Sequence, residues 1–319
     1  MAAALGDEVA LSGNLARGTT RAMEALSLKP VWKRIWQAPV ARLLPRLIVI
    51  GAQKGGTTAL AKYLAQHSGF LASREKEVSY FGCPPCYSKG PRWYASQWNK
   101  TSRRGQRGAW SKVIRFEASP HYMRAPQAAA EMHECIADVR LIALLRDPAD
   151  RAYSAWKMYR RYLASNPSFF EEWNRTCYSP QDIASFEPRT QAELDDFCLA
   201  IEREAAYIER GRSMEWSLLE YGLYGSQLRR YLEFFPRKQL LVLESDDLKQ
   251  RSAETLNRVL DFMGLEPWDW SRADLSPAFA SAEAAAMPAR GRDFLREYYH
   301  SSNRMLQGML EPLPVWAVG

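Results

Sequence analysis

The chain has 319 residues, and 47% of them are hydrophobic, which is enough to bury one large α/β core. Its formal net charge of +7 favours acidic ligands. Residues 1–45 contain no run of 18 apolar residues and no signal-peptide core, which excludes a membrane anchor of the usual kind from this segment. We therefore expect residues 1–45 to be a flexible or targeting extension and residues 46–319 to form the folded domain.

The first predicted element is a strand over residues 47–50, where an apolar, β-branched run ends in a glycine. A loop with one lysine and two glycines follows, and two threonines then open a segment with helical spacing. This arrangement presents backbone N–H groups and a positive helix end to a phosphate. A Walker A loop has its lysine after the second glycine, whereas Lys54 precedes both glycines, which argues against an ordinary NTPase. The predicted phosphate-binding residues are Lys54, Gly55, Gly56, Thr57 and Thr58.

Two later segments carry candidates for acid–base chemistry. Glu77 stands before an apolar run, and a buried glutamate in such surroundings can have its pKa raised toward neutrality, which suits a general base. The alternative is a solvated loop carboxylate that pairs with Lys76 or Arg74. His121 follows an expected strand at 113–116 and is the other catalytic candidate, with a structural histidine as its alternative. Glu117, at the end of that strand, is a candidate for lining the substrate site.

The cysteine spacing does not require a metal. Cys83 and Cys86 form a single C-x-x-C pair without a second pair or a histidine cluster, which is weak evidence for zinc. A local disulfide and two free thiols both remain open for this pair. Cys177 and Cys198 flank a polar stretch that we expect to be an insertion, and a bridge between them would suit a secretory compartment.

A second anion-binding position is predicted after the apolar run at 141–145, which has the pattern of a buried parallel strand. Pro148 is suited to a first helical turn, and a helix is expected over 149–163. Arg146 lies at the carboxyl end of the strand, where ligands of open α/β sheets collect. Ser154 lies two turns into the helix and is the second candidate ligand.

Basic residues gather in two further places. These clusters could bind an acidic substrate or could be ordinary solvated surface. No nucleic-acid-binding motif accompanies them, so we expect no nucleic-acid partner. The clusters comprise Arg103, Arg104, Arg107, Lys112 and Arg115, and then Lys157, Arg160 and Arg161.

Taken together, the two phosphate motifs resemble those of sulfotransferases, which use 3′-phosphoadenosine-5′-phosphosulfate (PAPS). The loop around Lys54 is similar to their 5′-phosphosulfate loop, and the segment from Arg146 to Ser154 has the spacing of their R-D-P-x-x-R-x-x-S motif. Residues 76–81 look like the K-E-x-x-F-F segment of the heparan-sulfate-type carbohydrate sulfotransferases. The resemblance extends over roughly residues 45–310.

This resemblance implies an α/β, P-loop-like three-layer fold with a central, mostly parallel sheet flanked by helices. It also implies that PAPS donates a sulfuryl group to a hydroxyl or amine of a glycan or small metabolite, and that 3′-phosphoadenosine-5′-phosphate is released without help from a metal. Glu77 would be the general base, Lys54 would neutralise the leaving oxygen, and Arg146 and Ser154 would bind the 3′-phosphate. Arg292 is also predicted to bind the nucleotide.

The chain departs from the family at Ala118, which stands where the E-K-[ST]-P motif has a lysine. This difference puts transition-state stabilisation and the type of acceptor in question. A catalytically inactive nucleotide-binding module and a P-loop kinase of small molecules are the alternatives. Golgi members of this family usually carry a membrane anchor, whereas residues 1–45 contain no such apolar run. We therefore expect a soluble, cytoplasmic enzyme, with the Golgi lumen or another organelle as the alternative.

Overall fold

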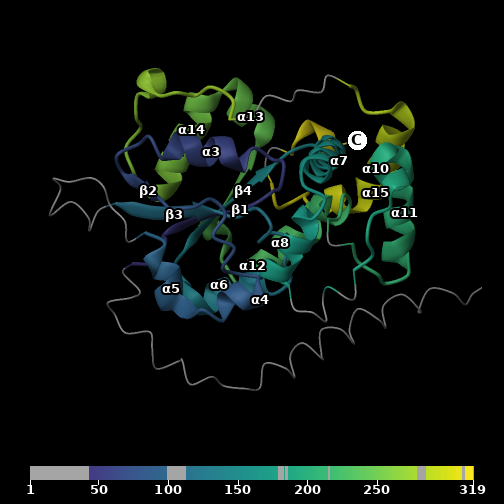
Figure 1. Cartoon of the computed structure of the whole chain (residues 1–319). Helices are drawn as coiled ribbons and strands as arrows, with labels where there is room; N and C mark the ends of the chain where they lie inside the picture. The colour runs from purple at the N-terminus through teal and green to yellow at the C-terminus, as the bar shows by residue number, and fades with distance from the viewer. Residues whose placement is uncertain are drawn as a thin grey trace, which may run out of the picture. The chain divides into compact units, whose positions relative to one another are not determined.

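The computed structural model describes residues 43–98, 113–178, 183, 186–214, 216–278, 285–310 and 313–318. The expected N-terminal extension therefore lies almost wholly outside the described residues, as does most of the first basic cluster. Within the described ranges, at least one helix separates each strand from the next along the chain (Figure 1).

One parallel sheet forms the centre of the described part. Its strands in chain order are β1 Leu47–Gly51, β2 Phe70–Ala72, β3 Ile114–Ala118, β4 Arg140–Leu145 and β5 Leu240–Glu244. They lie in the order β2-β3-β1-β4-β5, so β1 is central, and its Leu47 is opposite Phe116 of β3 and Arg140 of β4. Every residue of β1 is buried because helices cover both faces of the sheet, which explains its continuous apolar sequence. The predicted α/β class is confirmed.

Helices cover both faces of the sheet, and a third group lies beside it (Figure 1). One face carries α3 Thr57–Leu64, α13 Ser245–Gln250 and α14 Ser252–Met263. The other face carries α4 Pro84–Tyr87, α5 Gly90–Ser96, α6 Ala128–Cys135 and α12 Tyr224–Leu232. The group beside the sheet contains α7 Pro148–Ser165, α10 Gln191–Asp195, α11 Phe197–Glu209 and α15 Ala289–Arg304, and α8 is Phe169–Cys177. Among the described helices, none combines the length and apolar character needed to cross a membrane.

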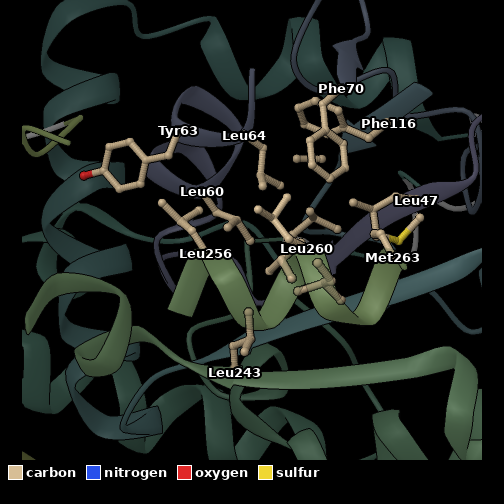
Figure 2. Packing of buried hydrophobic residues seen from close by; sticks show 14 of the residues in the cluster. Leu47, Leu60, Tyr63, Leu64, Phe70, Phe116, Leu243, Leu256, Leu260 and Met263 are labelled. Atoms are coloured by element: carbon tan, nitrogen blue, oxygen red, sulfur yellow. The ribbon is translucent and has the colours of Figure 1, made fainter. Parts of the chain in front are cut away.

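The main hydrophobic core lies between the sheet and the helices α3 and α14 (Figure 2). Leu60 and Leu64 of α3 and Leu256 and Leu260 of α14 are all fully buried in it. Burying one leucine side chain contributes about 1.5–3 kcal/mol, so these contacts fix α3 firmly on the sheet. The loop that precedes α3 is held in place as a consequence.

A second core holds the helices beside the sheet together. Trp156 and Tyr159 of α7, Phe197 of α11, and Leu295 and Tyr299 of α15 are all buried in this cluster. The indole N–H of Trp156 also donates a hydrogen bond to the backbone carbonyl oxygen of Glu193 (2.9 Å), which connects α7 to α10. Helix α7 is thereby a rigid element next to the carboxyl edge of the sheet.

All five cysteines of the chain are buried thiols, and none of them forms a disulfide in the structure. Cys83, Cys86 and Cys177 pack into one small cluster, although Cys177 follows the other two by about ninety residues. The thiols of Cys83 and Cys177 hydrogen-bond, and this contact raises the pKa of Cys83. The structure therefore brings Cys177 to the C-x-x-C pair, whereas Cys198 lies against the backbone of Gly291.

The start of α7 follows from the Arg-Asp-Pro sequence. The Asp147 side chain is the N-cap and accepts hydrogen bonds from the backbone N–H groups of Ala149 (2.8 Å) and Asp150 (3.3 Å). Pro148 occupies the first helical position, where its missing N–H costs nothing. Burial raises the pKa of Asp147, which the two backbone hydrogen bonds partly offset.

Replacing this cap tests how α7 is started. Asp147→Ala should lower the free energy of unfolding by about 1 kcal/mol, because two first-turn N–H groups lose their acceptor. Asparagine caps helices about as well as aspartate, so Asp147→Asn should keep most of the stability. Urea unfolding followed by circular dichroism measures both. Equal losses in the two variants would contradict the capping role and point to the charge of Asp147 instead.

Candidate functional site

The predicted phosphate loop lies at the carboxyl end of the central strand and turns tightly against β4. A Cβ added to Gly55 would come 2.3 Å from the backbone oxygen of Leu144, so no larger residue fits there. Gly56 has a φ of 100°, which favours glycine, and Lys54 also lies in the left-handed region with a φ of 66°. Left-handed residues in such a turn direct successive N–H groups to one side, as in anion-binding nests.

The N-terminus of α3 opens directly from this turn. Its N-cap is Gly56, which has no side chain to accept from the first-turn N–H groups. The helix end therefore offers N–H donors and a positive dipole to an anion. Thr57 is only 4% exposed, so Thr58 is the more accessible of the two predicted threonines.

Lys54 lies in the middle of a cluster of cations. It is partly buried, with its Nζ 3.4 Å from the Sδ of Met158 on α7. Burial lowers the pKa of Lys54 to about 8, and repulsion by neighbouring cations adds to the effect. Positive charges gathered in a half-buried place are unfavourable unless an anion compensates them, so this cluster has the electrostatics of an anion site. The cations that repel Lys54 are Arg161, Arg146, Arg151 and Lys76.

One face of α7 lines this cluster. Arg151, Ser154, Met158 and Arg161 are three or four residues apart, so they lie on the same side of the helix. Since Met158 contacts Lys54, and Arg151 and Arg161 repel it, this is the side that faces the loop. The structure thus brings the two predicted phosphate motifs together on either side of Lys54.

Gln53 was not recognised from the sequence, but it fastens the loop to α7. Its Oε1 accepts hydrogen bonds from the Tyr159 hydroxyl (3.0 Å) and from the Arg151 guanidinium (3.4 Å). Arg151 is completely buried and also donates to the Leu218 carbonyl oxygen. This arginine therefore holds the scaffold of the site and is not exposed to a ligand. The position of this glutamine directly before the loop lysine is the only feature of the sequence that could have indicated its role.

Arg146 and Arg292, both predicted to bind the nucleotide, have different surroundings. Arg146 is half-buried at the end of β4, close enough to Lys54 to lower its pKa. The guanidinium of Arg292 is 2.9 Å from a carboxylate oxygen of Asp150 and 4.0 Å from one of Asp147. Arg292 thus forms ion pairs with two carboxylates at the start of α7, and its predicted binding of the nucleotide stays a prediction.

Glu77 and His121, the two predicted acid–base residues, lie close enough for the charge of Glu77 to act on the imidazole. Glu77 pairs with Lys76, with 3.0 Å between Oε1 and Nζ. The ring nitrogens of His121 are buried, and burial lowers the pKa of His121, while the charge of Glu77 opposes the shift. His121 is therefore a neutral imidazole at pH 7. The described residues contain no group of three or more His, Cys, Asp or Glu side chains that could hold a metal.

The structure also shows the surroundings of Glu117 and Ala118. Glu117 is only 1% exposed and is enclosed by hydroxyl groups, so the expectation that it lines the substrate site is wrong. Its register on β3 turns its side chain into the protein. Ala118, opposite Val49 of β1, is buried in the main core.

Comparisons with known proteins agree with this geometry. A family model described as "Sulfotransferase domain" matches residues 44–274. The human bifunctional heparan sulfate N-deacetylase/N-sulfotransferase 3 is 26% identical over 302 residues, which cover 86% of this chain and 31% of that protein. The mouse heparan sulfate glucosamine 3-O-sulfotransferase 3B1 is 31% identical over 231 residues, covering 71% of this chain and 47% of that protein. The chain thus spans less than half the length of these two relatives.

A solved structure supports the fold. The sulfotransferase from Alicyclobacillus acidocaldarius aligns with a TM-score of 0.58 and 20% sequence identity. The alignment covers 83% of this chain and 95% of that one. The likeness therefore concerns the fold and extends over most of the chain.

The lowered pKa of Lys54 predicts that anion binding is coupled to proton uptake. A bound anion stabilises the ammonium form and raises the pKa again, so above about pH 8 binding should take up close to one proton. Affinity for 3′-phosphoadenosine-5′-phosphate should be constant below pH 8 and fall as pH rises above it. Calorimetry at pH 9 in two buffers of different ionisation enthalpy measures the uptake.

Lys54→Ala is the control for this experiment, because it removes the titrating group. The variant should bind more weakly and take up no proton at pH 9. Uptake that persists unchanged in Lys54→Ala would assign the linkage to another residue and contradict the electrostatic account.

Proposed function

The chain belongs to the sulfotransferase domain family, and from that premise we propose that it transfers a sulfuryl group from PAPS to a hydroxyl or amine of a glycan. The observation that carries this proposal is the cluster of cations around Lys54 at the open N-terminus of α3. The names of the two relatives, which specify N- and 3-O-sulfation of heparan sulfate, favour a glycan over a small metabolite.

The proposed nucleotide site uses both sides of the loop. The N–H groups of Gly56, Thr57 and Thr58, with the Lys54 ammonium, would hold the 5′-phosphosulfate. Arg146 and Ser154 would hold the 3′-phosphate, because they stand at the end of β4 and on the α7 face that turns to the loop. The absence of a side chain at Gly55 and Gly56 lets the backbone approach the ligand closely.

Bound PAPS supplies an activated sulfuryl group, and negative charge grows on the bridging oxygen as that group departs. Lys54 is protonated at neutral pH despite its lowered pKa of about 8, so its ammonium can neutralise the growing charge. Arg161 and Lys76 add positive charge around the same point. We propose that they compensate for the lysine that Ala118 replaces.

Glu77 is the proposed general base on the acceptor side. Its carboxylate lies 3.0 Å from the Lys76 ammonium, and from there it would accept the proton of an attacking hydroxyl. The nearby imidazole of His121, whose pKa is lowered by burial, adds no competing positive charge at pH 7. Deprotonation and sulfuryl transfer would then take place between Glu77 and Lys54, whose loops follow β2 and β1 at the same edge of the sheet.

The nucleotide assignment predicts a loss of affinity in Arg146→Ala. A hydrogen bond to a charged group contributes about 1.5–3 kcal/mol, so binding of 3′-phosphoadenosine-5′-phosphate should weaken by roughly ten- to a hundredfold. Wild type should also discriminate against AMP, which lacks the 3′-phosphate, and Arg146→Ala should lose that discrimination.

Isothermal titration measures both effects, with Arg229→Ala as the control, since Arg229 is exposed on α12. The control should bind both nucleotides as wild type does. An Arg146→Ala protein that still prefers the 3′-phosphorylated nucleotide to the wild-type extent would refute the assignment.

The base assignment predicts a loss of turnover in Glu77→Gln. Glutamine keeps the size of the side chain but cannot accept a proton, so turnover should fall by about a hundredfold to ten-thousandfold. Nucleotide affinity should barely change, because Glu77 faces the acceptor. Labelled PAPS with a panel of glycans and small metabolites measures transfer and identifies the acceptor class.

Glu75→Gln is the matched control, because Glu75 is an exposed carboxylate two residues away. It should transfer sulfate as wild type does. Glu77→Gln turnover above a tenth of the wild-type value would exclude Glu77 as the base.

A further inference from the structure

A buried carboxylate outside the proposed reaction holds the segment that carries the general base. We propose that Glu117 is a positioning residue, which anchors residues 78–80 and thereby fixes Glu77 toward the acceptor. This inference rests on the proposed function of Glu77. It concerns the residue that the sequence suggested as a substrate contact and that the structure places inside the protein.

The first contacts of Glu117 are three hydroxyl groups. One carboxylate oxygen accepts from the Ser119 hydroxyl at 2.7 Å, and both oxygens lie within 3.2 Å of the Tyr122 hydroxyl. The Tyr94 hydroxyl also donates to the carboxylate. Since Glu117 is only 1% exposed, water does not compete with these donors.

The same hydroxyl groups hold the backbone that follows Glu77. The Ser119 hydroxyl accepts from the N–H of Ser79 (3.2 Å), and the Tyr122 hydroxyl accepts from the N–H of Tyr80 (2.8 Å). The backbone N–H of Val78 favours the charged form of Glu117 directly. Three successive residues after Glu77 are thus attached to one carboxylate, either directly or through one hydroxyl.

The conformation of this segment needs such an anchor. Ser79 has a φ of 55°, a left-handed conformation that a residue other than glycine adopts only when its surroundings hold it. The ring of Tyr94 also stacks on that of Tyr80, with centroids 4.4 Å apart and planes 7° apart. Tyr94 therefore holds the segment both through its ring and through its contact with Glu117.

The donors around Glu117 favour an ionised carboxylate over a neutral polar group. Burial raises the pKa of Glu117 to about 7, while the hydrogen bonds from Tyr94, Ser119 and Tyr122 lower it. The NH2 group of a glutamine cannot accept from these hydroxyl groups, so at least one of them must turn away. Because Ser79 and Tyr80 depend on the orientation of those hydroxyl groups, the loop would loosen at its attachment.

Glu117→Gln and Tyr94→Phe test the proposal, the second as a smaller change that keeps the buried volume. In both variants kcat should fall, by about ten- to a hundredfold for Glu117→Gln, as misplacement of a catalytic group does. Affinity for 3′-phosphoadenosine-5′-phosphate should stay within about twofold, since the anchor does not touch the phosphate loop. Hydrogen exchange of the amides at 78–80 should become faster.

A double-mutant cycle separates positioning from general destabilisation. If Glu117 acts through Glu77, adding Glu117→Gln to Glu77→Gln should lower kcat no further. Glu193→Gln is the control for losing a buried carboxylate, because Glu193 is fully buried at the start of α10. It should leave kcat and the exchange at 78–80 unchanged.

The failures can be told apart. Wild-type turnover in Glu77→Gln would remove the proposed base, and the positioning role with it. A defective Glu77→Gln enzyme combined with normal turnover in Glu117→Gln and Tyr94→Phe would overturn only the positioning role. Additive losses in the double variant, or unchanged exchange at 78–80, would also overturn it.

Discussion

Repulsion among cations at the end of the central strand is the constraint on which the site depends. Burial, together with the repulsion of four neighbouring positive groups, lowers the pKa of Lys54 to about 8. A loop under such repulsion would open unless the scaffold held it. Gly55 packs against β4 where no larger residue fits, Gln53 is tied to α7, and α3 is fixed in the main core. The core thus stabilises an arrangement that favours a highly charged anion.

The two sides of the proposed site are held by different means. On the nucleotide side, one face of α7 meets the loop, and α7 is fixed by its Asp147 cap and by the second core. On the acceptor side, Glu77 belongs to a loop whose backbone hydrogen-bonds to hydroxyl groups around a buried carboxylate. The proposed nucleotide-binding residues therefore lie at the ends of β1 and β4 and on α3 and α7, whereas the proposed base depends on a polar network. A change in the loop that carries Glu77 should therefore lower turnover without lowering the affinity for the nucleotide.

Local features could be predicted from the sequence because they depend on neighbouring residues. The glycine loop before α3, Pro148 at the first position of α7 and the apolar strand β4 all appear where their patterns placed them. Burial of Glu117 could not be predicted, because it depends on how β3 pairs with its neighbours. The same holds for Cys177, which reaches the C-x-x-C pair only in the folded chain. The alternation of side chains along a strand shows which residues share one face of the sheet. It does not show which face is covered by other parts of the protein at the end of the strand.

The central claim is that the cations around Lys54 bind the phosphates of PAPS. The most direct test is a crystal structure of the protein with 3′-phosphoadenosine-5′-phosphate. The account predicts the 5′-phosphate at the first turn of α3 within hydrogen-bond distance of Lys54, and the 3′-phosphate between Arg146 and Ser154. A nucleotide bound elsewhere, or one whose 3′-phosphate contacts neither Arg146 nor Ser154, would contradict it.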